Sequence, residues 1–444
     1  MKRSSGDTIK VRPTIDFRAV NKLCPDDAFP LPRIQDCLDT ISGSTLFTCV
    51  DLLAGYHQVP VKEADIPKTA FVTKYGLYEF TRMPMGLKSS AQTFQRLIEL
   101  VLQGLQWSIC LIYLDDVIIF SKTFKEHMER LRLVLQRIRD AGLKLKPEKC
   151  QFLQPEVKFL GHVVSGDGVR PNPDNLMKVK QWSSPQTVTQ VRQFLGLASY
   201  YRKFIRNFSE IAAPLTNLTK KSESFYWSPE CEQAFQNIKT LLLTAPIVAY
   251  PNDDGEYILD TDASDIGIGA VLSQIQNGQE KVIAYGSRTL NKAEKNYCVT
   301  DKELLALRYF IEYYRQYLLG RKFLVRVDHQ PLIWLFSLKE PKGRIARWIE
   351  ILSAYDFSIL HRPGKKHSNA DSLSRCPQEK CLCAEIDTLE CLKCGPCRKC
   401  VKRAMEMEST LVENDPKYAA PITAVTRSLT AEHDKTYWTT WKEK

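Results

Sequence analysis

Short apolar runs rich in β-branched and aromatic residues dominate the first 165 positions of the chain. They are STLFTCVDL (44–52), TAFVTKY (69–75) and ICLIYLDDVIIF (109–120), and each has the length and composition of a strand. A longer segment, TFKEHMERLRLVLQRIRDAG (123–142), repeats apolar residues at helical spacing and ends at a glycine. This mixture predicts a first unit of packed strands and helices over residues 1–165.

The pattern changes twice further along the chain. Residues 166–245 carry two long helical patterns, at 187–208 and 231–246. From 246 to 376 the pattern predicts strands and helices in alternation: strands 256–264, 266–274 and 281–289, a helix 301–319, a strand 322–328, helices near 331–338 and 343–355, and a strand 356–361. The remainder, 377–444, has little core-forming sequence. We therefore predict a helical unit, a second α/β unit and a loose tail.

The composition is that of a soluble globular protein with a basic surplus. The 444 residues are enough for two to four domains, and apolar and charged residues make up 44% and 25%. Lys and Arg outnumber Asp and Glu by 62 to 51, a formal net charge of +11, which is consistent with a phosphate-rich partner. No apolar run reaches membrane-spanning length and no secretory signal is present. We expect no membrane association and a cytoplasmic or nuclear location.

Two adjacent aspartates, Asp115 and Asp116, interrupt the most apolar run of the chain. A two-residue hairpin turn is the simplest interpretation, but such turns favour a glycine that this pair lacks. Two carboxylates this close repel each other unless a cation lies between them. Asp51 ends another apolar strand, so the three carboxylates together would form an oxygen cage suited to Mg²⁺.

Several motifs in order resemble those of reverse transcriptases, in particular the reverse transcriptases of gypsy-like LTR retrotransposons. They are FTCVDLLAGYHQV (47–59), RMPMGLKSSAQTFQ (82–95), IYLDDVIIF (112–120), GLKLKPEKCQF (142–152) and VKFLGHVVSGDGVRPNPDN (157–175). The resemblance runs through roughly residues 8–376. It implies an α+β and α/β multidomain chain, namely a right-hand polymerase followed by a ribonuclease H-like domain. Partial fingers and the palm would occupy 1–165, the thumb or connector 166–245, and the ribonuclease H-like domain 246–376.

The resemblance implies a polymerase site built on Asp51, Asp115 and Asp116, with Asp116 in a supporting role. Two Mg²⁺ ions held there would activate the primer 3′-hydroxyl and bind the α-phosphate of the incoming nucleotide, and pyrophosphate would leave. The implied partners are an RNA template, a DNA primer and deoxynucleoside triphosphates.

Three further positions match nucleotide-binding residues of the family. Tyr56 falls where an aromatic ring lies under the sugar and rejects a 2′-hydroxyl, although an ordinary packed tyrosine is the alternative. Arg12, in VRPTIDFRAVNK, falls at a phosphate-binding position that suits a planar guanidinium. Met85 stands where the family often has Phe or Gln behind the nucleotide.

Binding of the primer and template is implied for two segments. Gly161, in FLGH, belongs to the hairpin that holds the primer terminus in relatives. The segment 187–208 interleaves basic and aromatic residues, a combination that neutralises phosphates and packs on sugars or bases. Its alternative is an amphipathic helix whose charges are only solvated. The residues that we expect to contact the duplex are Arg192, Tyr201, Arg202 and Lys203.

A second set of carboxylates follows in the order strand end, helix start, strand end and helix start. The four residues are Asp262, Glu303, Asp328 and Asp371. Each alone is unremarkable, but the order resembles the ribonuclease H fold, with Asp260 and Asp265 as competitors for the first position. The resemblance implies two Mg²⁺ ions that activate water to cut the RNA strand of an RNA–DNA hybrid. Contacts to the 2′-hydroxyl would discriminate against DNA.

Four cysteines in the tail are spaced by three residues, with basic residues beside them. Cys391, Cys394, Cys397 and Cys400 could hold Zn²⁺ as thiolates, and an unliganded segment is the alternative. No integrase or aspartic-protease motif can be read, so we interpret the chain as the middle of a longer polyprotein that supplies those segments. Two rival hypotheses are a decayed or domesticated remnant that binds nucleic acid without catalysis, and a chain in which only the ribonuclease H unit works.

Overall fold

The computed structural model describes residues 15–221, 223–328, 332, 336 and 343–361. Within them the chain divides into two compact units. The first contains the described residues up to Ile205 together with Pro214–Asp254 and Lys281–Ile283. The second contains Arg206–Ala213, Gly255–Glu280 and the described residues from Ala284 onward. A short segment well before the second α/β pattern is therefore grouped with it.

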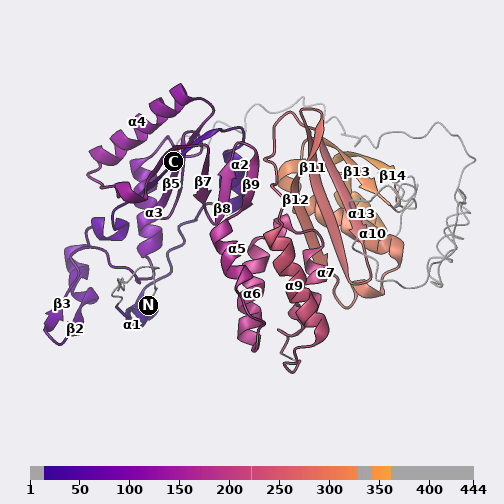
Figure 1. Ribbon diagram of the computed structural model, residues 1–444, viewed down its shortest axis with the longest axis horizontal. Helices are drawn as coiled ribbons and strands as arrows, with labels where there is room; N and C mark the ends of the chain where they lie inside the picture. Colours follow the sequence, from indigo (N-terminus) through magenta and orange to yellow (C-terminus); the bar gives the residue numbers. More distant parts are fainter. Residues whose placement is uncertain (1–14, 222, 329–331, 333–335, 337–342, 362–444) are drawn as a thin grey trace, which may run out of the picture. The chain divides into compact units, whose positions relative to one another are not determined.

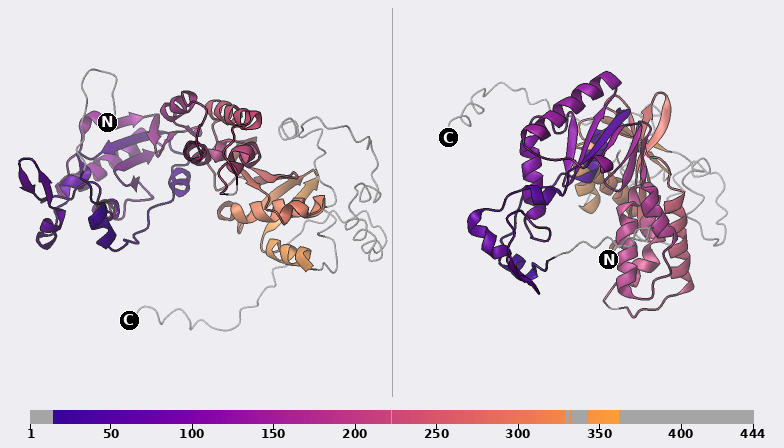
Figure 2. Two further views of the ribbon diagram at one scale, coloured as in Figure 1. Left: turned by 90° about the horizontal axis from the view of Figure 1, so that it is seen from below. Right: turned by 60° about the vertical axis from the view of Figure 1, so that its left-hand side comes forward.

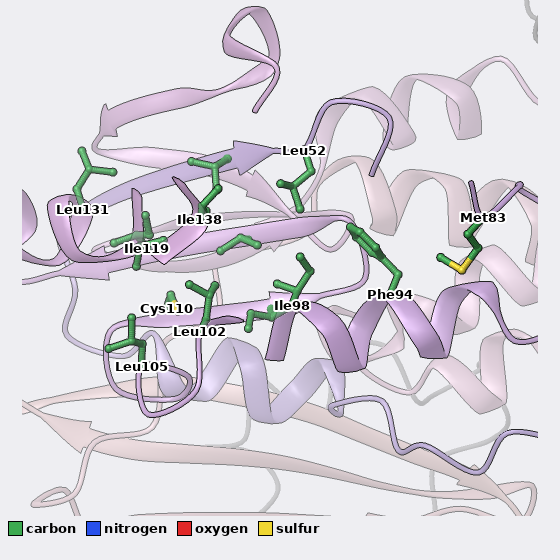
Figure 3. Packing of buried hydrophobic residues seen from close by; sticks show 14 residues of the cluster. Leu52, Met83, Phe94, Ile98, Leu102, Leu105, Cys110, Ile119, Leu131 and Ile138 are labelled. Atoms are coloured by element: carbon green, nitrogen blue, oxygen red, sulfur yellow. The ribbon is translucent and has the colours of Figure 1, made fainter. Parts of the chain in front are cut away.

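A four-stranded sheet lies at the centre of the first unit (Figure 1). Its order is β4 (Cys110–Tyr113), β5 (Asp116–Ser121), β1 (Leu46–Asp51) and β6 (Gln151–Gln154), and every neighbouring pair is antiparallel. The helices α3 (Ser90–Val101) and α4 (Phe124–Asp140) turn their apolar stripes toward the strands. Figure 3 shows this core, in which Phe94, Ile98 and Leu102 pack near Cys110 and Ile119. The apolar strands predicted at 44–52 and 109–120 are both present.

Smaller elements complete the first unit. A three-stranded antiparallel sheet follows the four-stranded sheet in sequence. Helices α6 and α9 pack through aromatic side chains such as Phe194 and Phe235, whose ring centroids lie 4.6 Å apart. The elements are α1 (Arg18–Leu23), α2 (Ile34–Thr40), η1 (Gly55–Gln58), η2 (Glu63–Thr69), β2 (Phe71–Thr73), β3 (Gly76–Tyr78), η3 (Pro147–Lys149), β7 (Glu156–Phe159), β8 (His162–Ser165), β9 (Gly168–Pro171), α5 (Pro173–Lys180), α6 (Val188–Tyr200), η4 (Arg202–Phe204), α8 (Ala213–Asn217) and α9 (Pro229–Leu243).

The single helix predicted over 187–208 is wrong. Helix α6 ends at Tyr200, a short η4 follows, and α7 (Phe208–Ile211) begins as a separate helix. Asn207 has a φ of 51°, in the left-handed region that asparagine tolerates and that no α-helix can continue through. The helical periodicity of the sequence did not reveal this break.

The second unit is built on a five-stranded mixed sheet (Figures 1 and 2). Its order is β12 (Gln279–Thr289), β11 (Gly267–Gln276), β10 (Tyr257–Ala263), β13 (Lys322–Val327) and β14 (Asp356–His361). The pair β10 and β11 is antiparallel, whereas β10, β13 and β14 run parallel. Helix α10 (Val299–Tyr313) packs on β10 and β11 and α13 (Gly343–Leu352) packs on α10, so the apolar stripe of α10 is covered on both sides.

Two helices predicted for the second unit differ from the structure or lie mostly outside the described residues. The helix predicted over 301–319 is divided at Tyr314 into α10 and α11 (Arg315–Leu318), because Tyr314 leaves helical geometry at φ −96° and ψ 19°. Apart from Leu332 and Phe336, the helix predicted near 331–338 lies outside the described residues. Across the described part of the chain, no helix combines the length and apolar character needed to cross a membrane.

Candidate active sites

The predicted polymerase aspartates lie where two strands of the first unit end. Asp51 and Asp116 are direct partners in the antiparallel pairing of β1 with β5, and Tyr113 pairs with Asp116 across the β4–β5 hairpin. The two-residue turn is therefore Leu114–Asp115, and the pair Asp115–Asp116 is not itself the turn. Backbone pairing alone brings Asp51 to the hairpin, as the sequence predicted for the three carboxylates.

The turn contains a backbone strain that a buried side chain compensates. Leu114 has a φ of 52°, which is unusual for a residue with a branched side chain. Its N–H donates to Oε1 of Gln95 at 2.6 Å, and Nε2 of Gln95 donates to the carbonyl of Ile112 at 3.2 Å. Gln95 is fully buried on α3, so it ties strand β4 and the turn that follows it to the helix. No motif or periodicity in the sequence singles out Gln95.

A lysine neutralises part of the negative charge at this site. Nζ of Lys149 lies 2.8 Å from Oδ2 of Asp51. Although Asp116 is an exposed residue, desolvation of its carboxyl group and then the charge of Asp51 raise its pKa, and Lys149 opposes this effect. In the described residues these aspartates do not form a close group of carboxylate oxygens of the kind found in the second unit. The negative charge of the site is thus partly compensated by a side-chain cation.

The predicted nucleotide-binding residues have different surroundings. Tyr56 packs on Phe94 with ring centroids 5.2 Å apart, and burial followed by the charge of Asp115 raises its pKa. The preceding Gly55 permits this packing, because a Cβ at that position would lie 2.6 Å from Cζ of Phe94. Met85 is half-buried in the loop before α3. Arg12 lies outside the described residues.

Gly161 and Tyr201 belong to one hydrogen-bonded turn. Leu160 and Gly161 have φ values of 46° and 70°, as a tight turn between β7 and β8 requires. The hydroxyl of Tyr201 donates to the carbonyl of Gly161 at 2.7 Å and accepts from the side-chain amide of Asn175. Because Tyr201 is fully buried, it holds the hairpin in place and offers no ring surface to a duplex.

The three predicted basic contacts are not equally accessible. Nζ of Lys203 donates to Oε1 of Gln35 at 3.0 Å, and burial lowers the pKa of Lys203 to about 8. Arg192 is exposed and donates to the carbonyl of Thr219 at 2.9 Å. Arg202 is half-buried. Arg192 is therefore a surface cation. The ammonium of Lys203 is instead buried against other residues of the first unit.

The second unit brings three of its four predicted carboxylates together. Ligand oxygens of Asp262, Glu303 and Asp328 all lie within 4.8 Å of one another. Asp262 lies near the end of β10, Glu303 lies in the first turns of α10, and Asp328 directly follows β13. Asp371 lies outside the described residues, as do Cys391, Cys394, Cys397 and Cys400.

Glu303 provides a test of whether this group fits a cation. Its Oε1 accepts from the N–H of Ala263 at 3.2 Å, while its buried Oε2 has no hydrogen-bond partner among the described residues. Burial, followed by the charges of Asp328 and Asp262, raises the pKa of Glu303 well above its ordinary value. A buried carboxylate oxygen without a partner is costly unless a cation binds it or a proton neutralises it. The three side chains therefore fit a divalent metal ion.

The competing aspartates have other partners. Asp260 accepts two hydrogen bonds from the guanidinium of Arg326, which also pairs with Glu280. Asp265 is paired with the ammonium of Lys302 at 2.5 Å. Strand alternation could not decide between Asp260 and Asp262 as the site residue, because residues two apart share a face of the strand. The ion pair of Asp260 with Arg326 decides it in favour of Asp262.

Two families match separate parts of the chain. Residues 2–164 match the family described as reverse transcriptase (RNA-dependent DNA polymerase). Residues 252–355 match the family described as RNase H-like domain found in reverse transcriptase.

Curated relatives are retrotransposon polyproteins. The Retrovirus-related Pol polyprotein from transposon 297 of Drosophila melanogaster is 44% identical over 367 residues, which are 82% of this chain and 34% of the relative. The corresponding polyprotein from transposon opus of the same organism is 38% identical, over 83% of this chain and 38% of the relative. The Transposon Tf2-3 polyprotein of Schizosaccharomyces pombe is 37% identical, over 83% and 28%. The chain thus spans about a third of the length of these relatives.

Solved structures share the fold at lower identity. A foamy viral protease-reverse transcriptase in complex with double-stranded DNA superposes with a TM-score of 0.69 at 24% identity, over 79% of this chain and 62% of that chain. A foamy viral protease-reverse transcriptase in complex with an RNA/DNA hybrid gives a TM-score of 0.64 at 23% identity, over 84% and 51%. These likenesses confirm the fold class predicted from the sequence, and the polyprotein relatives confirm the predicted resemblance.

Proposed function

This chain belongs to the reverse transcriptase family, with the RNase H-like domain of that family after the polymerase unit, and we propose that it has both corresponding activities. It would copy RNA, and DNA, into DNA from a primer and would cut the RNA strand of RNA–DNA hybrids. The observation that carries the proposal is the presence of two separate carboxylate sets, each at the ends of strands in its own unit.

For the polymerase reaction, Asp51, Asp115 and Asp116 would hold the metal. Bound Mg²⁺ supplies Lewis-acid chemistry, lowering the pKa of an attacking hydroxyl and neutralising charge on the transferred phosphate. Gln95 would keep the hairpin in position through its bonds to Ile112 on β4 and to Leu114 in the turn. Lys149 is paired with Asp51, so its ammonium would compete with a metal ion for that carboxylate.

Tyr56 supports selection of deoxynucleotides in this proposal. Its ring is fixed against Phe94 by packing that only Gly55 permits, so it cannot swing away from a bulkier sugar. Replacing Tyr56 with a smaller side chain would then admit ribonucleotides. Arg12 and Met85 are proposed as further nucleotide contacts, and Gly161, Arg192 and Arg202 as contacts to the primer–template, on the family match alone.

For hybrid cleavage, Asp262, Glu303 and Asp328 would hold the metal, with Asp371 as a fourth ligand carried over from the family. The backbone N–H of Ala263 orients one oxygen of Glu303, which leaves the other for ligation. Tail cysteines that bind Zn²⁺, integrase and protease segments of the parent polyprotein, and a location in a cytoplasmic particle or the nucleus are also proposed.

Two assays on the full chain test the proposal. With Mg²⁺ and a primed RNA template, we expect extended DNA; with a preformed RNA–DNA hybrid, we expect shortened RNA carrying a 3′-hydroxyl. A folded sample that yields neither product would contradict the proposal and favour a remnant that only binds nucleic acid.

A further inference from the structure

His127, in the first turn of α4, is completely buried in the first unit, and the proposed reactions make no use of it. Nδ1 of its ring lies 2.8 Å from Oγ of Ser121 at the end of β5. Nε2 lies 2.7 Å from Oγ1 of Thr48 in β1. The two nitrogens of one ring therefore connect a helix to two neighbouring strands of the central sheet.

The partners of the two hydroxyl groups determine which nitrogen of this ring carries the proton. Oγ of Ser121 donates to the carbonyl of Thr123 at 3.2 Å, so it accepts from Nδ1–H of His127. In a neutral ring Nε2 is then the acceptor, and the hydroxyl of Thr48 donates to it. Oγ1 of Thr48 in turn accepts from the N–H of Leu153 at 3.1 Å. The bonds thus form one continuous chain from β6 through β1 and α4 to Thr123, the N-cap of α4.

The chain of bonds passes through an irregular part of the sheet. Leu153 has a φ of 53°, which is unusual for a residue with a branched side chain. The register of β1 against β6 shifts between Phe47 and Cys49, on either side of Thr48. The hydroxyl of Thr48 therefore satisfies a backbone N–H at a place where the strand pairing is disturbed. The orientation of that hydroxyl is fixed by the ring of His127.

The strand held in this way carries one of the proposed polymerase carboxylates. Asp51 follows Thr48 by three residues in β1 and is paired with Asp116 in β5. Ser121, the other partner of the ring, closes the opposite end of the same strand pair. A displacement of β1 at Thr48 would therefore move Asp51 relative to Asp116.

A second proton on the ring would disturb this arrangement. It would occupy Nε2, remove the acceptor of the Thr48 hydroxyl and place a charge in a fully buried ring. Burial and then the charge of Arg130 lower the pKa of His127, and Glu126 opposes this effect. Arg130 and Glu126 lie on α4 itself and form an ion pair, whereas the strands present the uncharged Thr48 and Ser121 to the ring. The stabilisation is therefore complete above about pH 6.5, the ordinary value for histidine, and declines as the pH falls below it.

We infer that His127 is a positioning residue of the polymerase site, which holds β1, and through it Asp51, in place only while its ring is neutral. The consequence for catalysis rests on the proposed polymerase activity. The bonding itself does not, so the two can be tested separately.

Hydrogen exchange of the full chain, measured by mass spectrometry at pH 7.5 and pH 5.5 and corrected for intrinsic exchange, tests the bonding. The His127→Gln variant cannot titrate, and its amide can still bond one of the two hydroxyl groups. On acidification, the protection of Leu46–Asp51 should fall about three- to tenfold more in the parent than in this variant. His57→Gln removes an exposed histidine of the first unit and should respond to acid like the parent.

A second variant tests the chain of bonds without any titration. Thr48→Val keeps the shape of the side chain and leaves the N–H of Leu153 without its acceptor. Exchange of Gln151–Gln154 should then accelerate already at pH 7.5, while Tyr257–Ala263 in the second unit should exchange as in the parent. Equal protection of Gln151–Gln154 in Thr48→Val and the parent, or equal acid responses of the parent and His127→Gln, would overturn the inference.

The pH profile of primer extension supplies the catalytic readout. Between pH 7.5 and pH 5.5, the ratio of primer extension to hybrid cleavage should fall further in the parent than in His127→Gln. The same fall in both proteins would refute the positioning role. Absence of primer extension by the parent would contradict the proposed function instead, and hydrogen exchange would still decide whether His127 holds β1.

Discussion

The two carboxylate sets of this chain differ in how completely the protein assembles them. In the second unit, Asp262, Glu303 and Asp328 already lie within 4.8 Å of one another, and a buried oxygen of Glu303 has no hydrogen-bond partner among the described residues. In the first unit, Asp51 and Asp116 face each other on paired strands, and Lys149 is bonded to Asp51. The carboxylates of the second unit are therefore already assembled for a metal ion. In the first unit, the ammonium of Lys149 already binds one of the carboxylates.

The difference follows from the elements that supply the ligands. A helix start packed on the sheet delivers Glu303 into the protein interior, where burial makes a bare carboxylate unstable. In the first unit a strand end delivers Asp51 and a hairpin turn delivers Asp115, and Lys149 reaches Asp51. We therefore expect the first site to be completed by the phosphates of its substrate and the second to bind metal unaided.

The largest effects should come from removing one carboxylate of each set. Asp115→Asn should reduce primer extension at least about a hundredfold, equivalent to roughly 2.7 kcal/mol of transition-state stabilisation, because it removes a metal ligand. Asp262→Asn should do the same to hybrid cleavage. Each variant should retain the other activity, and measuring both activities on both variants checks this. Loss of both activities in either variant would show that the sites are not independent.

A smaller effect is expected from Gln95→Leu, which removes the acceptor for Leu114 and leaves two backbone groups of the hairpin without their buried partner. Such a loss costs about 1–3 kcal/mol, so primer extension should fall roughly tenfold. Hybrid cleavage should not change. Gln103→Leu makes the same chemical change at an exposed position and serves as the control. Equal behaviour of the two variants would refute a positioning role for Gln95.

Removing Lys149 should sharpen the contrast between the sites. In Lys149→Met no ammonium competes for Asp51, so the Mg²⁺ concentration for half-maximal primer extension should fall. The ion pair is partly exposed and worth about 1 kcal/mol or less, which limits the shift to about fivefold. The matched control, Lys158→Met, removes a similar exposed pair with Asp174. The metal requirement of hybrid cleavage should stay constant in both variants.

The smallest effect concerns Lys203, whose pKa is lowered to about 8, chiefly by burial. Between about pH 8 and the ordinary lysine range, the folded chain releases a proton that the unfolded chain keeps, so stability should rise with pH. The urea midpoint of the parent should therefore increase from pH 7.5 to 9.5 relative to Lys203→Met. Lys125→Met, an exposed change on α4, should follow the parent. A parallel pH dependence in parent and Lys203→Met would contradict the burial of this ammonium.

The sequence predicted the elements that periodicity and motif order determine. The strands ending at Asp51 and Asp262 and the helix carrying Glu303 all follow from local pattern. Contacts between distant positions could not be predicted: Gln95 and Leu114 are 19 residues apart, and Asp51 and Lys149 are 98 apart. The spacing of apolar residues does not predict which polar side chains will be in contact.

The segment around Asn207 shows that a local pattern can also predict an element that the fold does not form. Its residues continued a helical pattern, and a single left-handed residue redirected the chain toward Asp262. Glu210 lies two residues beyond the predicted helix, and its place beside Asp262 became visible only in the fold. Asparagine in a long amphipathic pattern was the one available signal.

Counting bound Mn²⁺ by electron paramagnetic resonance, in the absence of nucleotide and nucleic acid, tests the contrast between the two sites most directly. The account predicts that the parent binds Mn²⁺, that Asp115→Asn binds as much as the parent, and that Asp262→Asn loses most of the binding. Retention of binding in Asp262→Asn together with its loss in Asp115→Asn would contradict the account.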